Sequence, residues 1–340
     1  MMKAIVYRTY GSPDVLEFTT LAEPTPKPDE VLIRVVASSI NQGDWHLLHG
    51  EPLLVRPSAG LWRPKHPILG ADVAGVVVAV GRAVTRFEPG DAVFGDLSAS
   101  GRGGFAEYVA APEDALALKP AAVPFADAAA TPTAGVTALQ GLRTHGRIAP
   151  GQQVLINGAS GGVGTFAVQI AAALGATVTA VCSTRNVAQA RRLGADTVID
   201  YTQEDFTQGG QRYDLIFDTV GNRSVAEYRQ VLAPQGRFVT TTFLPALALR
   251  GPWLAWRGGP SMQNMMAKPD RDDLAFLAGL LEERRLTPVI DRCYPLDETA
   301  DALRYVGAGH ASGKVIVVPE GADGLAPTAA HAVAEPGDRP

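Results

Sequence analysis

The chain has 340 residues, of which 46% are hydrophobic, enough for a buried core and about two domains. A formal net charge of −5 and 19% charged residues argue against nucleic acid as a partner, because the chain has no overall attraction for phosphate backbones. Two cysteines, Cys182 and Cys293, and a strand-like start at Met1–Tyr7 without an apolar leader favour a cytoplasmic protein without a signal peptide or membrane span.

Short β-rich runs separated by turn residues occupy residues 1–124. The runs are Lys3–Tyr7, Glu30–Ser38, Ala74–Val80 and Ala92–Phe94. Proline and glycine clusters lie between them, which is typical of strands joined by turns. We therefore predict a β-rich, barrel-like first domain.

Helical and strand patterns alternate over residues 125–265. Because apolar strands that alternate with helices form parallel sheets covered on both faces, this pattern predicts a doubly wound α/β domain. The predicted helices are Ala126–Ala130, Gly135–Thr144, Thr165–Leu174 and Asn186–Leu193, and the predicted strands are Gln153–Asn157, Thr177–Val181, Thr197–Asp200, Tyr213–Asp218 and Gly236–Thr242.

The remaining segments are less regular. Leu244–Trp256 is too short and interrupted to cross a bilayer; it could touch a membrane surface, but we favour a pocket wall or a subunit interface. Residues 321–340 have few large apolar groups and are predicted to be a disordered tail. Residues 266–320 are expected to return to the first domain through helices Arg271–Arg284 and Leu296–Val306 and strands Arg292–Pro295 and Lys314–Val318.

A glycine-rich loop lies between the predicted strand Gln153–Asn157 and the next helix. Read against G-x-G-x-x-G, it places Ala159, Gly161 and Gly164 at the three glycine positions. The second glycine lets backbone N–H groups approach a pyrophosphate, and the third allows close packing of helix and strand. Alanine at the first position is a departure that a small side chain can accommodate. The strand–turn–helix context favours a dinucleotide-binding loop over a connection without a ligand.

The residues after the next strand indicate which nicotinamide cofactor is bound. A NAD-binding unit carries an acidic residue about 20 residues beyond the loop. Here the corresponding stretch has Ser183, with Arg185 two residues later. A hydroxyl and a guanidinium bind the 2′-phosphate that a carboxylate would repel, so the sequence predicts NADPH. Read alone, Arg185 could equally be a solvated residue at a helix start.

Short motifs spread over about residues 1–320 match one family. They are Asn157–Gly164, Ser39–Asp44, Ile68–Gly75, Gly90–Val93, Gly104–Tyr108, Leu193–Asp196 and Gly313–Val315. Together they resemble the zinc-independent quinone oxidoreductases of the medium-chain dehydrogenase/reductase superfamily. The resemblance implies a GroES-like β domain with a Rossmann domain, C-terminal strands that return to the first domain, an active site in the cleft between the domains, and a homodimer or homotetramer.

The zinc-dependent alcohol dehydrogenases are the competing branch of this superfamily. They carry a catalytic cysteine after an early strand, a Gly-His-Glu motif and a later cysteine. The corresponding positions here read Asn41, Ala71 with Asp72, and a stretch Thr131–Thr137 without cysteine. The four-cysteine structural lobe is missing as well, since no cysteine precedes Cys182. We therefore expect no metal site.

The resemblance also implies roles for three residues near the substrate. Asn41 could hydrogen-bond a carbonyl group or the cofactor ribose. Asp44 either lines the cleft or caps the helix that follows it. His46 lies where relatives often carry tyrosine, and it either donates a proton near neutral pH or is a partly buried loop histidine.

On the cofactor side, the family pattern extends to a dozen positions. Tyr201 either faces the 2′-phosphate or is a surface tyrosine, and Phe243 is expected near the nicotinamide. Lys314 either reaches the cofactor phosphates or is an ordinary solvated lysine. The full predicted set is Thr137, Ser160, Gly161, Gly162, Val163, Gly164, Ser183, Arg185, Tyr201, Val220, Phe243 and Lys314.

The missing zinc ligands restrict the chemistry that we expect. The nicotinamide supplies hydride, while the protein orients the reactants and excludes water. Because no Lewis acid polarises a simple ketone, the predicted acceptors are those that take hydride easily, a quinone or an α,β-unsaturated carbonyl. Two alternatives stay open: an NADPH-binding protein with little turnover, and a zinc-dependent alcohol dehydrogenase.

Overall fold

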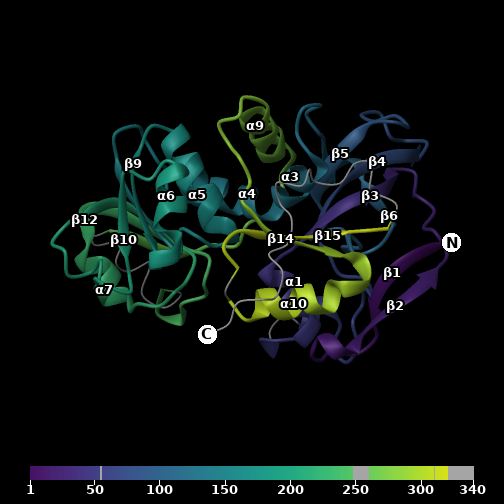
Figure 1. The fold of residues 1–340 in the computed structure, drawn as a ribbon, viewed down its shortest axis with the longest axis horizontal. Coiled ribbons are helices and arrows are strands. Elements are labelled where there is room, and N and C mark those ends of the chain that lie inside the picture. Colours follow the sequence, from purple (N-terminus) through teal and green to yellow (C-terminus); the bar gives the residue numbers. More distant parts are fainter. Residues whose placement is uncertain (54–55, 248–259, 310, 321–340) are drawn as a thin grey trace. The chain divides into compact units, whose positions relative to one another are not determined.

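The computed structural model describes residues 1–53, 56–247, 260–309 and 311–320, which form two units (Figure 1). Unit 1 contains Met1–Thr133 and the segment that begins at Pro269, and unit 2 spans Ala134–Lys268. The predicted tail at 321–340 and residues 248–256 of the Leu244–Trp256 segment lie outside the described residues.

Unit 2 is built on a six-stranded sheet in which all neighbouring strands are parallel. The strands follow the order β10-β9-β8-β11-β12-β13. The chain therefore begins in the middle of the sheet, proceeds to one edge and then returns to build the other half. This order is that of doubly wound dinucleotide-binding domains and confirms the predicted α/β class. The strands are β8 (Gln153–Asn157), β9 (Thr177–Cys182), β10 (Thr197–Asp200), β11 (Tyr213–Asp218), β12 (Leu232–Thr240) and β13 (Ser261–Asn264).

The helices of unit 2 pack on this sheet. α5 (Gly162–Ala173) contacts β8 and β9, and its residues from Gly164 to Ala171 are all buried. Most of them are apolar, and the two polar ones, Thr165 and Gln169, hydrogen-bond backbone oxygens of the helix itself. The predicted helix Gly135–Thr144 is divided in the structure. α4 (Pro132–Leu139) leads along the chain into a π-helix, Gln140–His145. The other helices are α6 (Val187–Arg192) and α7 (Val225–Gln230), with a 3₁₀ turn at Thr184–Asn186.

Unit 1 contains a seven-stranded sheet and a separate antiparallel hairpin. The sheet runs β14-β15-β3-β4-β5-β7, with β6 also paired to β3. Two strands of the sheet, β6 and β7, and one strand of the hairpin, β2, were not predicted. The strands are β1 (Met2–Tyr7), β2 (Leu16–Leu21), β3 (Glu30–Ile40), β4 (Asp72–Val80), β5 (Ala92–Asp96), β6 (Tyr108–Pro112), β7 (Leu116–Leu118), β14 (Ile290–Pro295) and β15 (Lys314–Val318).

The C-terminal strands join the N-terminal sheet, as predicted. β15 pairs antiparallel with the end of β3, with Val315 opposite Ile40 and Val317 opposite Ser38. This register places Lys314, the first residue of β15, next to the point where β3 ends and Asn41 follows. The pairing is therefore the step that brings together residues from the two ends of the sequence.

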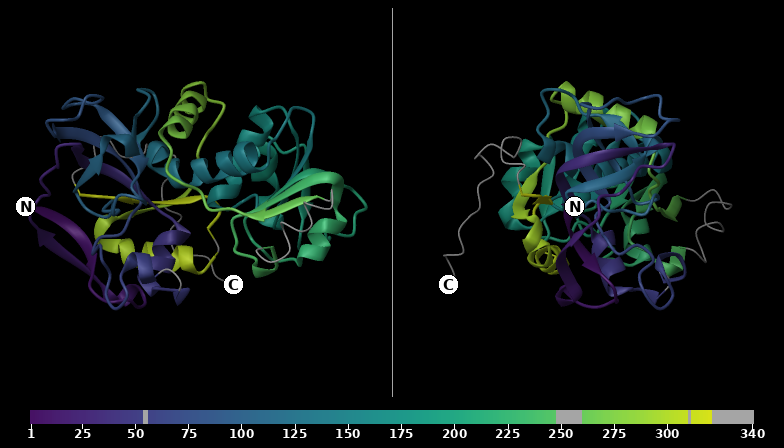
Figure 2. Two further views of the ribbon diagram at one scale, coloured as in Figure 1. Left: turned by 180° about the vertical axis from the view of Figure 1, so that it is seen from behind. Right: turned by 90° about the vertical axis from the view of Figure 1, so that its right-hand side faces the viewer.

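The core of unit 1 lies on the β3–β4 sheet. Alternate residues of β3, including Val31, Ile33 and Val35, are buried in one cluster with Val73 and Val77 of β4, because successive side chains of a strand point to opposite faces. Helix α10 packs against α1 and β15 (Figure 2). The helices are α1 (Gln42–His49), α2 (Arg56–Ala59), α3 (Phe125–Ala130), α9 (Arg271–Glu282) and α10 (Thr299–Gly307), with 3₁₀ turns at Pro13–Val15, Glu113–Ala115 and Leu296–Glu298. Within the described ranges, no helix has the length and apolar character needed to cross a bilayer.

Candidate active site

The glycine-rich loop follows β8 at the carboxyl end of the parallel sheet. Its left-handed residue is Gly158, with φ 85°, and a Cβ there would lie 2.4 Å from Thr219 Oγ1. The turn that we had assigned to the first glycine position is therefore made one residue earlier. Ala159 is buried and donates its N–H to Val181 O at 3.0 Å. Alanine fits that position because Gly158 supplies the unusual backbone conformation.

Packing within the loop requires glycine at 164 but not at 161. A Cβ on Gly164 would lie 2.0 Å from Gly158 O, so the close approach of α5 to the loop demands glycine. Gly161 has an ordinary extended backbone, with φ −77° and ψ 174°, and a Cβ there would meet only Gly158 O at 3.5 Å. Neither backbone strain nor internal packing explains glycine at 161. Its missing side chain leaves the outer face of the loop open, as a bound pyrophosphate requires.

The first turn of α5 carries the donors for such a ligand. The leading N–H groups of a helix have no partner within the helix, and here they belong to Gly162, Val163 and Gly164. The turn contains no acidic side chain. The positive end of the helix dipole is therefore free of a competing carboxylate and favours an anion.

A buried carboxylate organises the neighbouring loop, where the strand order reverses between β8 and β11. Asp218 ends β11 and accepts hydrogen bonds from Asn157 Nδ2 at 2.8 Å, from Thr240 Oγ1 at 2.8 Å, and from the N–H groups of Val220 and Gly221 at 3.0–3.2 Å. Ligands of doubly wound sheets bind at this switch point. The sequence analysis missed Asn157, Asp218 and Thr240, although each is the polar last residue of an apolar strand.

The proposed 2′-phosphate residues lie at the carboxyl end of β9. Ser183 follows β9 and is half-buried, and Arg185 is exposed in the 3₁₀ turn that follows. Sequence analysis missed a carboxylate nearby, because Asp200 belongs to the next strand. Asp200 accepts a hydrogen bond from Thr184 Oγ1 at 2.6 Å, and this bond lowers the pKa of Asp200. β9 and β10 are neighbours, and Asp200 lies opposite Cys182, the residue just before Ser183. A prediction that these two strands pair would have placed Asp200 near the proposed 2′-phosphate site.

Other predicted cofactor residues extend this edge of the sheet. Tyr201, Val220 and Phe243 follow β10, β11 and β12, and they are 55%, 46% and 66% exposed. Val220 and Phe243 thus follow neighbouring strands of the sheet, whereas Tyr201 follows the edge strand β10, with β9 and β8 between it and β11. An exposed ring or apolar side chain at each of these strand ends can pack against a flat ring of a ligand. Ser160 is half-buried in the loop, and Thr137 is half-buried on α4.

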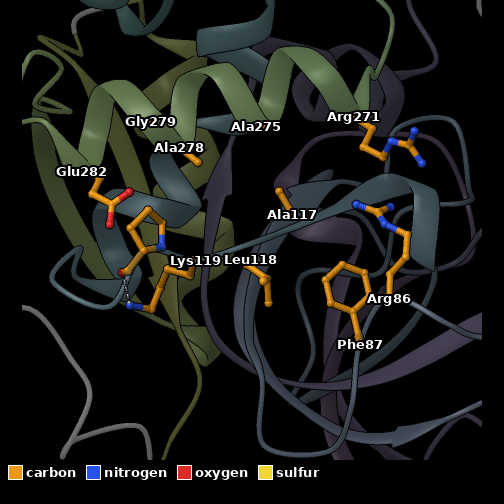
Figure 3. Close-up of a pocket in the computed structure, with 11 residues that line it drawn as sticks. Arg86, Phe87, Ala117, Leu118, Lys119, Arg271, Ala275, Ala278, Gly279 and Glu282 are labelled. Atoms are coloured by element: carbon orange, nitrogen blue, oxygen red, sulfur yellow. Dashed lines mark hydrogen bonds between the residues drawn. The ribbon is translucent and has the colours of Figure 1, made fainter.

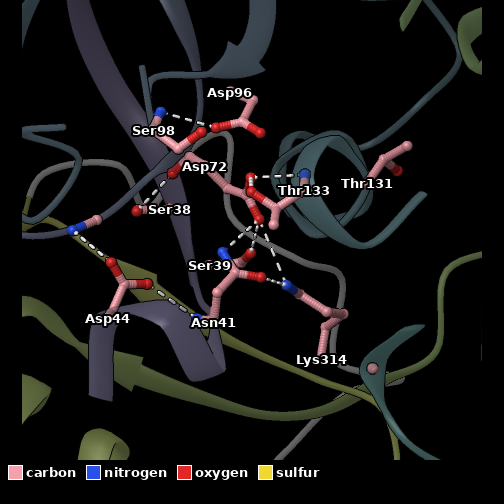
Figure 4. Close-up of polar contacts among 12 residues, drawn as sticks. Ser38, Ser39, Asn41, Asp44, Asp72, Asp96, Ser98, Thr131, Thr133 and Lys314 are labelled. Carbon is pink, nitrogen blue, oxygen red and sulfur yellow. Dashed lines mark hydrogen bonds and ion pairs between the residues drawn. The ribbon is translucent and has the colours of Figure 1, made fainter. Parts of the chain in front are cut away.

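In unit 1, the buried carboxylate of Asp72 accepts hydrogen bonds from polar residues that are far apart in the sequence (Figure 4). Asp72, the first residue of β4, is fully buried. Its Oδ1 accepts from Thr133 N at 2.8 Å and Thr133 Oγ1 at 2.6 Å, and its Oδ2 accepts from Ser39 Oγ at 2.6 Å. Oδ2 also accepts from Asn41 Nδ2 at 2.9 Å and Lys314 Nζ at 3.3 Å. The charge of Asp72 is thus fully satisfied by hydrogen bonds and one cation.

Lys314 contacts two of the residues in this cluster. It is 3% exposed, and its Nζ donates to Asn41 Oδ1 at 2.6 Å as well as to Asp72. The solvated-lysine interpretation is therefore wrong, because the ammonium is buried and paired. A role at the cofactor phosphates stays a prediction.

Asp44 and His46 both lie on α1, but Asp44 is buried and His46 is exposed. Asp44 is fully buried, and burial raises its pKa, opposed by Arg102 at 3.8 Å and by N–H donors. Its carboxylate accepts from the N–H groups of Asn41 at 2.9 Å and Gly70 at 3.2 Å, so it holds the start of α1 against the strand that follows. His46 is exposed and lies outside these bonds.

Comparisons with known proteins agree with this arrangement. The sequence model of the alcohol dehydrogenase GroES-like domain matches residues 27–121, and that of zinc-binding dehydrogenase matches residues 193–317. A chloroplast envelope quinone oxidoreductase homolog of Arabidopsis thaliana is 35% identical over 341 residues, covering 94% of this chain and 99% of the relative. The chain belongs to the quinone oxidoreductase group of the medium-chain dehydrogenase/reductase superfamily.

Further members support the same assignment. An NADPH-dependent alkenal/one oxidoreductase, chloroplastic, of Arabidopsis thaliana is 35% identical over 330 residues, covering 94% of this chain and 80% of the relative. The structure of the quinone oxidoreductase from Coxiella burnetii superimposes with a TM-score of 0.85 at 30% identity, covering 93% of this chain and 99% of that one. The predicted family, the GroES-like and Rossmann fold class, and the prediction of an oxidoreductase are confirmed.

One family model is named for zinc, but the residues of this medium-chain oxidoreductase do not fit that metal. Asn41 and Asp72, at two of the positions compared with the zinc branch, are bridged by the Lys314 ammonium. Burial raises the pKa of both Cys182 and Cys293 to about 11, so neither thiol is a ready thiolate ligand. Within the described ranges, no three histidine, cysteine or acidic side chains converge as a metal site would need.

The oxidoreductase also has an open groove of about 570 Å³ in unit 1, between α9 and the segment around β7 (Figure 3). Arg86 and Arg271 flank one end, and both contact Asp114. Its lining includes Leu118 of β7 and Ala275 of α9. None of the predicted site residues lines this groove, so it has no part in the assignment of the active site.

Proposed function

We propose that this oxidoreductase transfers hydride from NADPH to a quinone or an α,β-unsaturated carbonyl. The observation that carries the proposal is the outer face of the loop at Gly161, which is open although no contact among the described residues requires glycine there. The names of relatives that act on quinones and alkenals support the choice of acceptor.

Bound NADPH supplies the hydride in this chemistry. The N–H groups of Gly162, Val163 and Gly164 bind its pyrophosphate, with Ser160 and Thr137 as further polar contacts. Ser183 and Arg185 bind the 2′-phosphate. Tyr201, Val220 and Phe243 supply apolar contacts at the carboxyl edge of the sheet. Apart from Thr137, which lies within α4, each role follows from a position at a strand end or near a helix N-terminus, where such ligands bind.

The acceptor is held by unit 1 through Asn41. Its half-buried carboxamide donates a hydrogen bond to the carbonyl oxygen. Hydride forms a C–H bond at the β-carbon, the π electrons move onto the oxygen, and the resulting enolate takes a proton from water or from the exposed His46. For a quinone, hydride addition to a ring carbon and protonation of the enolate oxygen give a keto-enol tautomer, which becomes the hydroquinone when that ring carbon loses a proton to solvent and the second oxygen gains one. Asp44 fixes the segment that carries Asn41 and does not exchange protons with the substrate.

Three finer assignments belong to the same proposal. We propose NADPH rather than NADH, because a hydroxyl and a guanidinium follow β9 at Ser183 and Arg185. We propose a homodimer, as the family resemblance implies. We propose a cytoplasmic location, because the chain has only two cysteines, and these are free.

The test is a comparison of acceptors and cofactors. The wild-type protein should oxidise NADPH with a naphthoquinone and with cyclohexenone, and not with cyclohexanone. Ser183→Asp and Arg185→Ala should raise the KM for NADPH far more than the KM for NADH. Arg229→Ala, which removes an exposed arginine of α7, is the matched control and should leave both unchanged.

Two results would contradict the proposal. Tight binding of NADPH without turnover of any quinone or enone would make the protein a cofactor-binding protein instead. If Ser183→Asp and Arg185→Ala changed the KM for NADPH and the KM for NADH equally, the assignment of the 2′-phosphate site would be refuted.

A further inference from the structure

The carboxamide of Asn41 has only one orientation that its neighbours permit. An ammonium group can only donate hydrogen bonds, and a carboxylate can only accept them. Lys314 Nζ lies 2.6 Å from Oδ1, and Asp72 Oδ2 lies 2.9 Å from Nδ2. Rotating the amide by half a turn would place Nδ2 against the ammonium and Oδ1 against the carboxylate. Both contacts would then be repulsive. Lys314 and Asp72 therefore fix the amide of Asn41 with Oδ1 toward the ammonium and Nδ2 toward the carboxylate.

This orientation leaves one hydrogen of Asn41 available. Nδ2 carries two hydrogens, and one is directed at Asp72. Across the described residues, the second has no acceptor. The side chain is half-buried, so this hydrogen is accessible while the ammonium behind the amide is not, since Lys314 is 3% exposed.

The two charges themselves are buried and hydrogen-bonded. Asp72 is fully buried and holds five hydrogen bonds, from Ser39, Asn41, Lys314 and two atoms of Thr133. Lys314 begins β15, and the β3–β15 register holds its backbone beside Ile40. A cation bonded to the oxygen of an amide draws electron density from the nitrogen and strengthens its N–H as a donor.

We propose that Lys314 is a positioning residue that makes Asn41 a dedicated hydrogen-bond donor to the carbonyl oxygen of the acceptor. This inference rests on the proposed function and deepens it. The ammonium acts through Asn41 and does not touch the substrate. The arrangement selects acceptors whose oxygen gains negative charge as hydride arrives, because an N–H donor supported by a cation binds a developing oxyanion more strongly than a neutral carbonyl.

Three variants test this role. Lys314→Met removes the cation and leaves the buried Asp72 without its partner charge, which also lowers stability. The double variant Lys314→Met with Asp72→Asn removes both charges together. It should regain part of the lost melting temperature. The asparagine introduced at position 72, with its oxygen held by Thr133, presents an N–H instead of an acceptor oxygen to Asn41 and no longer holds Asn41 as a donor. Lys27→Met removes an exposed lysine that pairs with Glu30 at 2.8 Å and serves as the control.

Two measurements are made on each variant. The first is steady-state turnover with cyclohexenone, in which kcat should fall roughly 10- to 100-fold in both Lys314 variants while the KM for NADPH stays within about 3-fold. The second does not depend on activity. Para-nitrophenol is titrated into the NADP⁺ complex, and its absorbance reports the phenolate fraction of the bound probe. The wild type should favour the phenolate, and both Lys314 variants should shift its bound pKa upward by about one unit.

The outcomes separate this inference from the proposed function. If the double variant regains both stability and full turnover, or if it binds the phenolate as the wild type does, Lys314 is merely structural and the inference is overturned. If the wild type turns over no acceptor, the proposed function fails, and the phenolate titration still decides the role of Lys314. Unchanged behaviour of Lys27→Met, together with a stable but slow double variant, supports the inference.

Discussion

Replacing Asp96 by asparagine should remove part of the pH dependence of the unfolding free energy. Asp96 ends β5 and lies directly opposite Asp72 in the β4–β5 ladder. It is 4% exposed, and burial, followed by the nearby charge of Asp72, raises its pKa to about 6. Asparagine keeps an oxygen to accept the hydrogen bond that Ser98 N donates to Asp96 at 2.8 Å. The substitution therefore removes the titration with little change in shape.

The magnitude follows from the difference between folded and unfolded pKa values. The folded value of about 6 exceeds the ordinary value of 3.8 by about two units, which corresponds to about 3 kcal/mol. Because the folded pKa is the higher one, this stabilisation is complete below about pH 4 and is lost as the pH rises through about 6. Relative to wild type, Asp96→Asn should thus gain about 3 kcal/mol of unfolding free energy between pH 4 and pH 8.

Urea unfolding at a series of pH values measures this gain. The difference in unfolding free energy between Asp96→Asn and wild type should grow from about pH 4 to about pH 6 and stay constant at higher pH. Glu17→Gln, which removes an exposed carboxylate 3.7 Å from Arg8, should give a curve parallel to wild type. A constant difference for Asp96→Asn over the whole range would refute the reasoning.

Further predictions concern the cofactor loop and its surroundings. Gly164→Ala should destabilise the protein by about 3 kcal/mol, because its Cβ would lie 2.0 Å from Gly158 O. Gly161→Ala should change stability by less than about 1 kcal/mol yet raise the Kd for NADPH at least about 10-fold. Thermal unfolding and nicotinamide fluorescence titration distinguish the two, and equal NADPH affinity of Gly161→Ala and wild type would contradict the account. Asp200→Asn should tighten NADPH binding a few-fold and leave NADH unchanged, since it removes an anion that accepts from Thr184; tighter binding of both cofactors would contradict it.

The fold was largely predictable because most of its strands correspond to short runs of β-forming residues in the sequence. Gln153–Asn157, Thr197–Asp200 and Tyr213–Asp218 have the predicted bounds, since each is a short β-rich run that ends at a polar residue. β6 and β7 were missed because β6 ends in Pro112 and β7 spans only three residues. Their strand conformation depends on pairing with β3 and β5, which short-range propensity does not report.

The site was predictable only where its residues are close in sequence. The loop from Gly158 to Gly164 carries its own signature, although the left-handed turn falls one residue earlier than expected. The contact between Lys314 and Asn41 spans 273 positions and exists only because β15 pairs with β3. Sequence spacing assigned neither the pairing of Lys314 nor the carboxylate of Asp200 beside Thr184, because both contacts depend on strand order.

The central claim is that hydride from NADPH adds to the conjugated carbon of the acceptor. It is tested most directly by incubating the wild-type protein with cyclohexenone and NADPH that carries deuterium at its transferable position, and locating the label in the product by NMR. The account predicts a saturated ketone with deuterium on the β-carbon. An allylic alcohol with deuterium on the carbinol carbon would contradict it.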